Sequence, residues 1–426
     1  MNKVVCLPSY LLPRVLDPEA LYFSMYSVPT SSNVGYVASY LRTYVERAGF
    51  RPDANTWDFT TFALSVSAAD KAISRTASPN GWTRQINLQL AVHDVSLWQS
   101  LKPQLEDMLK FLTGDYWFLE FVVDPKPLPY ARKRKEYNAD CVALLSGGMD
   151  SLVGAINLVN EHHKPLLVSH VVRGNEAIQS SFANQISPQS GFCHWNEAIK
   201  LPSTAQGESS TRARSIVFFA FAALAATGLP TFFNQKKDIY VAENGFISLN
   251  VSLNPARVSS LSTKTTHPIY MECLRSVWDQ LGLNLLLNTP YKFNTKGEML
   301  VDCKDQALMK RLIGHTVSCG KYAVHKLTHC GRCVPCMVRR AAFLKANIPD
   351  TTRYVYQSLC NAGHGRHPND IGAMAMQCVM AKRQDFMARV IGEFAFANHN
   401  DRSDFISVYK RGLLEVSEFL ESQSII

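Results

Sequence analysis

The feature that most constrains this fold is a glycine-rich turn between an apolar run and a helical pattern. Residues 141–145 read CVALL, residues 146–151 read SGGMDS, and residues 152–159 read LVGAINLV. The first run suits a short buried strand and the last an apolar helix. Glycine lets a turn adopt unusual backbone angles and approach a ligand closely. A strand, such a turn and a helix in this order predict a phosphate-binding loop.

The side chains of this turn fit a nucleotide bound with magnesium. Ser146 and Ser151 can donate hydroxyl hydrogen bonds, and the backbone N–H groups of residues 147–149, Gly147, Gly148 and Met149, can point at phosphate oxygens. Asp150 is placed to hold Mg²⁺ or to fix the loop. The lysine of the Walker pattern is missing after the glycines. The alternative is an ordinary turn in which Asp150 caps the helix.

The pattern that follows predicts one α/β domain around this loop. Short apolar runs alternate with helical stretches, which favours a parallel sheet with helices on both faces. We expect strands over residues 141–145, 166–170, 239–241 and 285–287, and helices over residues 152–161, 213–227 and 267–281.

The rest of the chain divides at changes of composition. Residues 1–123 predict a small α+β accessory domain, with strands over 59–66, 85–92 and 117–123 and a helix over 96–112. Residues 124–138, DPKPLPYARKRKEYN, combine three prolines with a basic run and predict a linker. The loop domain then covers 139–345, and a helical segment covers 346–426.

Four cysteines near the end of the loop domain predict a structural zinc site. Cys319, Cys330, Cys333 and Cys336 follow the pattern C-x₁₀-C-x₂-C-x₂-C. Four thiolates can complete the tetrahedral sphere of Zn²⁺. A redox pair would leave two of the sulfurs unexplained. One of three nearby histidines is the alternative ligand: His315, His325 and His329.

Together these motifs resemble the PP-loop ATP pyrophosphatases, whose signature is SGGxDS and which cleave ATP between the α and β phosphates. Within that group, a loop followed by a cysteine quartet is similar to the 7-cyano-7-deazaguanine synthases, the QueC-like enzymes. Residues 210–215, STRARS, look like that family's segment before a helix, which places Arg214 near the nucleotide. Residues 289–298, TPYKFNTKGE, look like its TP-x₄-TK-x-E element, with Lys296 as the phosphate partner. The resemblance covers residues 140–345 and implies an adenine nucleotide α-hydrolase-like fold.

The chain departs from that family in the substrate region. The family's Tyr-Pro-Asp-Cys-Arg sequence is replaced by residues 243–268, ENGFISLNVSLNPARVSSLSTKTTHP. This stretch and the N-terminal part look more like the QueC-like components of Qat anti-phage defence operons. Candidates for an acceptor pocket are Glu243, Asn250, Arg257, Lys264, Thr266 and His267. Each has a structural alternative: Asn250 and Thr266 in turns, His267 as a helix cap, Arg257 and Lys264 as solvated surface.

The resemblance implies an enzyme that uses ATP, Mg²⁺ and Zn²⁺. A carboxylate such as 7-carboxy-7-deazaguanine would attack the α-phosphate and form an acyl adenylate, with Asp150, Arg214 and Lys296 as the catalytic set. An amine would then react, either ammonia on the way to a nitrile or an amine of a partner protein from the same operon. A PP-loop tRNA-modifying enzyme and a non-catalytic nucleotide sensor in a defence complex are the alternatives.

Composition limits the surroundings of the protein. Eleven cysteines, an odd number without a disulfide-like spacing, favour a reducing cytoplasm. No stretch reads as a signal peptide, and the apolar run 216–229 is too short to span a bilayer, so we expect no membrane contact. The net charge of +9 leaves nucleic acid possible, but anionic small molecules explain it equally well.

Overall fold

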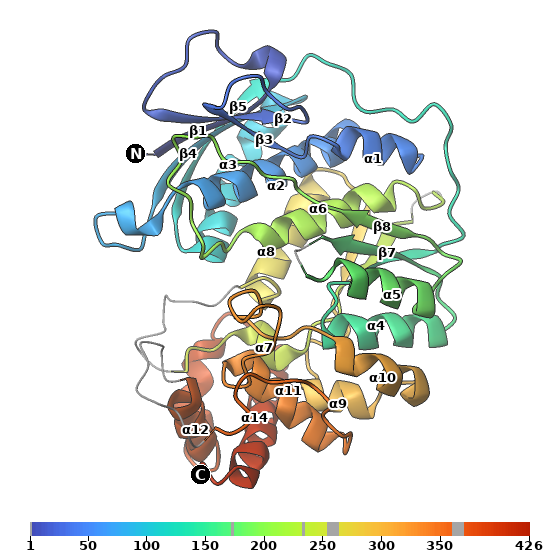
Figure 1. Cartoon of the computed structure of the whole chain (residues 1–426), viewed down its shortest axis with the longest axis vertical. Helices are drawn as coiled ribbons and strands as arrows, with labels where there is room; N and C mark the ends of the chain where they lie inside the picture. Colours follow the sequence, from blue (N-terminus) through green and yellow to red (C-terminus); the bar gives the residue numbers. More distant parts are fainter. Residues whose placement is uncertain (1, 172–173, 232–234, 254–263, 360–369) are drawn as a thin grey trace.

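A computed structural model of the chain describes residues 2–171, 174–231, 235–253, 264–359 and 370–426 (Figure 1). The substrate candidate Arg257 lies outside the described residues. The described chain is an α/β protein with two five-stranded sheets, and the strands pair only in parallel within each sheet. None of the helices in these ranges is long and apolar enough to cross a membrane.

The N-terminal sheet has the order β3-β2-β1-β4-β5. In the middle of this sheet, Val4 lies opposite Leu21 on one side and Leu88 on the other. Parallel pairing throughout corrects the expected α+β class for this part of the chain. Its strands are β1 (Asn2–Pro8), β2 (Ala20–Met25), β3 (Val34–Val37), β4 (Gln85–Val92) and β5 (Tyr116–Val123).

The second sheet has the order β10-β9-β6-β7-β8 and carries the glycine-rich loop at the end of its central strand. Val142 of that strand pairs with Leu166 and Ile239 on its two sides. The four strands expected here are confirmed within a residue or two, and β8 is additional. The strands are β6 (Cys141–Leu144), β7 (Pro165–His170), β8 (Phe192–Trp195), β9 (Lys237–Tyr240) and β10 (Leu285–Asn288).

Helices flank both sheets and form most of the C-terminal part. The α-helices are α1 (Leu41–Arg47), α2 (Ala54–Ala72), α3 (Val95–Thr113), α4 (Met149–Asn160), α5 (Glu176–Ile186), α6 (Arg214–Ala226), α7 (Gly245–Leu249), α8 (Pro268–Gln280), α9 (Lys296–Val301), α10 (Gln306–Leu312), α11 (Val334–Lys345), α12 (Asp370–Ala381), α13 (Phe386–Val390) and α14 (His399–Ser422). Short 3₁₀ turns are η1 (Ser9–Leu11), η2 (Arg75–Ala77), η4 (Ile313–His315) and η5 (Ile391–Phe394).

The expected strand over residues 59–66 is wrong, because this segment lies inside α2. The helix is buried on nearly all sides, so its sequence lacks the polar face that marks a surface helix. Two of its hydroxyl groups are satisfied within the helix: Thr60 and Ser65 donate to the carbonyl oxygens of Thr56 and Thr61 at 2.9 and 2.7 Å. Residue types common in strands are therefore accommodated in a buried helix.

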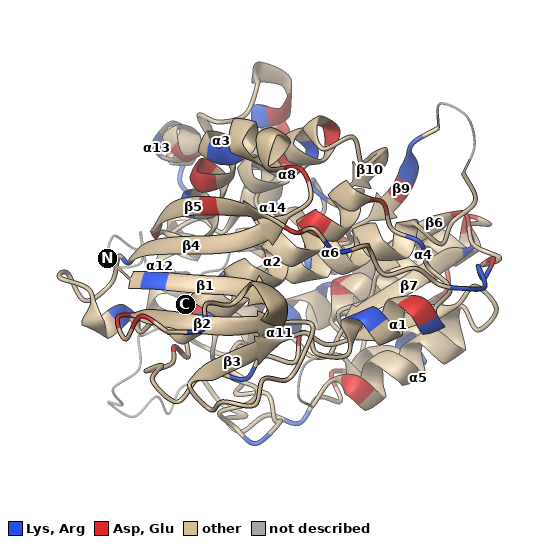
Figure 2. Cartoon of the chain, turned by 90° about the horizontal axis from the view of Figure 1, so that it is seen from above, with Lys and Arg blue, Asp and Glu red and all other residues tan. Residues whose placement is uncertain are grey.

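Helices α2 and α6 pack against each other and join the two sheets into one core. Buried side chains of both sheets, including Phe23, Leu88, Val142 and Ile239, belong to one hydrophobic cluster with these helices. Figure 2 shows α2 and α6 between the strands β1–β5 and the strands of the second sheet. Residues 124–138 contain no helix or strand and run outside this core.

Candidate functional site

The glycine-rich loop connects the end of β6 to the start of α4. Gly147 has φ of +88°, a conformation that glycine adopts without strain. Gly148 precedes the first turn of α4, and no side chain caps the N–H groups of that turn. The alternative in which Asp150 caps the helix is wrong, because its carboxylate contacts other elements. The amide groups and the helix dipole at this end can therefore meet an anion.

Hydroxyl groups and a glutamine hold the loop in shape. The hydroxyls of Ser146 and Ser151 lie 3.0 Å apart, and Ser146 Oγ accepts the N–H of Gly148 at 3.2 Å. Gln179 Nε2, on α5, donates to the carbonyl oxygens of Ser146 and His170 at 3.0 and 3.2 Å. Sequence reasoning missed Gln179, because nothing local marks a residue 33 positions away as part of the loop.

The loop opens onto a cavity of about 210 Å³. The cavity brings together the predicted phosphate loop, the predicted lysine and residues of the cysteine-bearing segment. Its lining is Ser146, Gly148, Met149, Asp150, Ser151, Ala242, Glu243, Ile247, Lys296, Val317, Ser318 and Pro335. A backbone amide row, a lysine and two carboxyl groups around one small cavity suit a polyphosphate with a divalent cation.

Asp150 and Lys296 form a buried ion pair at this cavity. Asn244 supports it, since its N–H and its side-chain amide donate to Asp150 Oδ2 at 3.1 and 2.6 Å. Burial alone would raise the pKa of Asp150, but the charge of Lys296 and these hydrogen bonds keep it below its ordinary value. The carboxylate is therefore charged at neutral pH and pairs with the ammonium group of Lys296.

Glu243 is the second acid of the cavity, and its pKa is shifted in the opposite direction to that of Asp150. Burial and the adjacent negative charge of Asp150 raise the pKa of Glu243 well above its ordinary value. Asp150 and Glu243 would be the carboxyl groups that hold Mg²⁺, since this ion prefers oxygen ligands and keeps several waters.

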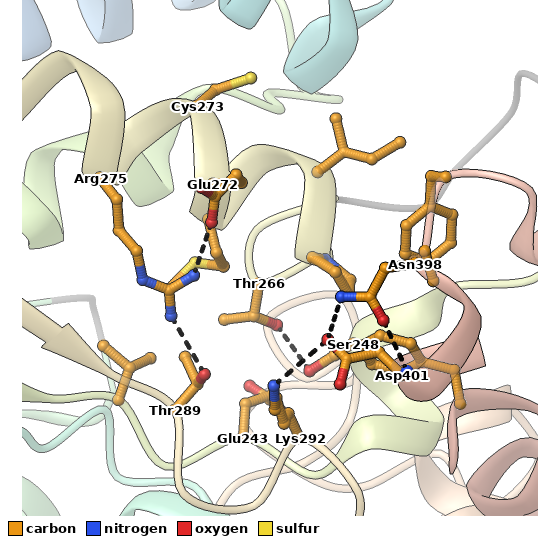
Figure 3. A pocket seen from close by; sticks show the side chains of 17 residues that line it. Glu243, Ser248, Thr266, Glu272, Cys273, Arg275, Thr289, Lys292, Asn398 and Asp401 are labelled. Atoms are coloured by element: carbon orange, nitrogen blue, oxygen red, sulfur yellow. Dashed lines mark hydrogen bonds and ion pairs between the residues drawn. The ribbon is translucent and has the colours of Figure 1, made fainter. Parts of the chain in front are cut away.

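Glu243 also lines a larger cavity of about 450 Å³ (Figure 3). The walls come from α8, the end of β10 and the start of α14. Arg275 pairs with Glu272 at 3.4 Å on one side, and Lys292 with Asp401 at 3.8 Å on the other. Positively and negatively charged side chains surround the cavity, together with the aromatic rings of Phe396 and Phe405. A small molecule with polar groups fits such a lining.

Three of the predicted acceptor residues, Thr266, Asn250 and Lys264, differ in whether they line a cavity. Thr266 lines the larger cavity, and its hydroxyl lies 3.1 Å from that of Ser248. Asn250 ends α7 in the left-handed conformation, with φ of 47°. Lys264 stacks its ammonium group over the ring of Phe111 at 4.1 Å. Of these three, only Thr266 lines either of the two cavities.

His267 caps α8. Its Nδ1 atom accepts the N–H of Ile269 at 3.2 Å, and the ring packs between Phe111 and Phe396. Burial, with the positive charge of Lys264, lowers the pKa of His267 to about 4. The ring is therefore neutral at pH 7, as a hydrogen-bond acceptor at a helix N-terminus must be. These contacts support the structural alternative, in which His267 caps the helix. His267 lines neither of the two cavities, and its substrate role stays a prediction.

Arg214 lies at the same edge of the sheet as the loop. It is the exposed first residue of α6, which packs on β6 and β7. Burial and then the positive charge of Arg214 lower the pKa of His170, the last residue of β7, to about 3. Gln179 links His170 to Ser146, so Arg214 is close to the loop without lining its cavity.

Lys296 is held by the C-terminal helix, which sequence reasoning assigned no chemistry. Thr295 and Glu298 form a capping box at the start of α9. Glu415 of α14 accepts the hydroxyl of Thr295 and, at 3.3 Å, the N–H of Gly297. Both contacts flank Lys296. Burial raises the pKa of Glu415 to about 7.

The raised pKa of Glu415 predicts a pH effect on stability. The folded state favours the protonated acid, so stability should fall as pH rises from about 4.5 to about 7. The Tm of each protein is measured at pH 5 and at pH 8. The fall in Tm should be larger in the wild type than in Glu415→Gln, by about 2 °C or more. Glu421→Gln, at an exposed carboxylate of the same helix beside Lys382, is the control and should match wild type. An equal loss in all three proteins would contradict the assignment.

The four predicted zinc ligands converge in one buried cluster. Their sulfur atoms all lie within 4.8 Å of one another, and the pairs Cys319–Cys333 and Cys330–Cys336 are both 3.9 Å apart. A tetrahedron of sulfurs about 2.3 Å from Zn²⁺ has edges of about 3.8 Å. The donor set therefore fits zinc. Backbone N–H groups of Lys321 and Arg332 point at Cys319 and Cys330 at 3.3 and 3.4 Å, as suits thiolates.

The histidine alternatives do not join this cluster among the described residues. His329 Nε2 instead accepts the N–H of Ser318 at 3.2 Å. Burial and the charge of Arg339 lower the pKa of His329 to about 4, which keeps the ring neutral for this contact.

The cysteine cluster is joined to the glycine-rich loop by a short strap, residues 316–318. The N–H of Val317 donates to the carbonyl oxygen of Gly147 at 2.9 Å. The buried guanidinium of Arg339 fixes the strap through Thr316 and Ser318, at 2.7 and 3.3 Å. Because Val317 and Ser318 line the small cavity, the cluster shapes the same site.

No family model and no curated protein matches the chain.

Proposed function

We propose that the protein is an enzyme that uses ATP to adenylate a carboxylic acid, with release of pyrophosphate. The observation that carries the proposal is the position of Glu243 between two cavities. One cavity has the glycine-rich loop, Asp150 and Lys296; the other is large enough for a small polar molecule. Two reactants in these cavities would meet at Glu243, and bringing reactants together supplies much of such a rate enhancement.

In the reaction proposed, a carboxylate oxygen of the substrate attacks the α-phosphorus. The bond from that phosphorus to the bridging oxygen of the β-phosphate breaks, and pyrophosphate leaves. Charge builds on the phosphate oxygens, where the loop amides and Lys296 can stabilise it. Mg²⁺ held by Asp150 and Glu243 supplies further charge when bound. Arg214 reaches the nucleotide from the start of α6.

A second step then forms a carbon–nitrogen bond. An amine attacks the acyl carbon, AMP leaves with the former carboxylate oxygen, and the amine loses a proton. The sequence resemblance supports a 7-carboxy-7-deazaguanine-type acid and a role in anti-phage defence. The amine is ammonia, with the amide dehydrated to a nitrile after a second activation, or it belongs to a partner protein from the same operon.

Isotope exchange tests the first step. Wild-type protein with MgATP, 7-carboxy-7-deazaguanine and labelled pyrophosphate should form labelled ATP only when the acid is present. Mass spectrometry after addition of ammonia or of operon partners then separates a free nitrile from a mass increase on a partner protein. Acid-independent exchange, or none, would overturn the proposed reaction.

The alternative of tRNA modification places its RNA contact on the basic run 132–135. These residues are exposed and precede β6, near Lys237 at the start of β9, where burial and then the charge of Arg134 lower the pKa of that lysine. The run therefore lies at the amino ends of the parallel strands, opposite to the edge with the loop. This separation favours a small-molecule acid over a tRNA held by the linker. The alternative predicts salt-sensitive tRNA binding.

The alternative of a nucleotide sensor needs no acceptor cavity. It predicts that ATP binds without being cleaved, in the presence of the acid as in its absence. Acid-dependent pyrophosphate release that is lost in Asp150→Ala would exclude it.

A further inference from the structure

The segment just before Arg214 is bonded to the N-terminal half of the chain. The N–H groups of Gly207 and Glu208 donate to the carbonyl oxygens of Ala72 and Lys71 at 3.3 and 2.8 Å, at the end of α2. In return, the N–H of Arg75 donates to the carboxylate of Glu208 at 2.7 Å. Residues that sequence reasoning placed in the loop domain are thus held by the N-terminal one.

Asp70 contacts the two residues that immediately precede Arg214 in the sequence. Its Oδ2 atom accepts the N–H groups of Arg212 and Ala213 at 2.6 and 2.7 Å. Ala213 is the N-cap residue of α6, and no side chain caps the helix. Asp70, fully buried on α2, thus holds the two residues that precede the helix and places a negative charge at the positive end of α6.

A buried network fixes Asp70 in turn. Arg84 pairs with Asp70 and, at 2.7 Å, with Asp115. Arg75 pairs with Asp115 at 2.8 Å. The four side chains are at most 3% exposed. Each carboxylate in this buried network faces an arginine, so the network restrains the carboxylate of Asp70.

We infer that the N-terminal sheet serves to position Arg214, with Asp70 as the positioning residue. The N-terminal half presents the carboxylate, and the carboxylate fixes the two residues that lead into α6. Their position sets where the exposed guanidinium of Arg214 stands at the edge with the loop. The last step rests on the proposed function, because it requires an anionic nucleotide at that edge.

Asp70→Asn tests this role against a matched control on the same helix. Positioning residues behind a site typically contribute 10- to 100-fold, so we expect kcat/KM for acid-dependent pyrophosphate release to fall by about that factor. Asp58→Asn is the control: its carboxylate is also buried, but it accepts from His93, at 2.8 Å from N–H and 2.6 Å from Nδ1. It should leave kcat/KM within about twofold of wild type.

A double-mutant cycle separates positioning from general destabilisation. If Asp70 acts through Arg214, then Asp70→Asn combined with Arg214→Ala should be no slower than Arg214→Ala alone, within about twofold. Multiplied losses would overturn the inference. If Asp70→Asn does not fold, Glu208→Gln takes its place in the cycle, since Glu208 holds the same segment from a less buried position.

Amide hydrogen exchange distinguishes failure of the inference from failure of the proposed function. Asp70→Asn should increase exchange over residues 208–216, whereas Asp58→Asn should not. If these exchange results are found but the wild-type protein releases no pyrophosphate, the positioning role of Asp70 stands and the proposed reaction is wrong. Unchanged exchange in Asp70→Asn would overturn the inference whatever the activity of the wild type.

Discussion

Replacement of Lys296 by methionine should slow acid-dependent pyrophosphate release by about 100- to 1000-fold. Lys296 is the cation at the small cavity, and removal of one group that stabilises developing negative charge typically has this effect. The variant should also be less stable, by about 3–5 kcal/mol, because it leaves the carboxylate of Asp150 buried without its partner. Initial rates and chemical unfolding measure the two effects separately.

The control for Lys296→Met is the double variant Asp150→Asn, Lys296→Met. It removes both charges, so most of the lost stability should return, while activity should stay at the low level of the single variant. Recovery of activity together with stability would contradict a direct role of Lys296 and reduce it to a structural ion pair.

Loss of one cysteine of the quartet should remove the metal and collapse the adjoining part of the site. We expect about one zinc per wild-type chain and almost none in Cys336→Ser, since structural zinc sites close with four ligands. Apparent zinc binding energies of about 10–16 kcal/mol in zinc-finger peptides show how much folding such an ion can support. Nucleotide binding should weaken too, because the strap 316–318 joins the cluster to Gly147.

Cys378→Ser is the matched control for the quartet. Its thiol is equally buried and donates to the carbonyl oxygen of Leu413 at 3.3 Å, a contact that a hydroxyl can keep. Metal analysis should therefore give about one zinc per chain in this variant. Zinc retained in Cys336→Ser, or lost equally in both variants, would contradict the four-cysteine site.

The parts of the fold that sequence predicted are those fixed by neighbouring residues. The strand, the loop and α4 follow one another directly in the sequence, and three of the four clustered cysteines lie within seven residues. Short sequence patterns therefore predict both the loop and the cysteine cluster. Residues 59–66 predict a strand but lie in α2, because the burial of this helix comes from two partners distant in sequence, the N-terminal sheet and α6. A pattern method recognises a helix by its polar face, and this helix lacks one.

The contacts that complete the site span long separations. Glu415 meets Thr295 across 120 residues, and Asp70 meets Arg212 across 142. Neither acid stands in a motif, so only the packed fold identifies it. His267 shows the converse: a chemically attractive residue beside Pro268 has its ring nitrogen engaged by the N–H of Ile269, two positions away.

The most direct test of acid adenylation follows one oxygen atom. With ATP, ammonia and an acid carrying ¹⁸O in its carboxylate, the account predicts AMP that has gained one ¹⁸O, in an amount equal to the pyrophosphate released. The label must move because the carboxylate oxygen that attacks the α-phosphorus leaves with AMP. Formation of ADP and phosphate, or AMP whose new oxygen comes from water, would contradict the account.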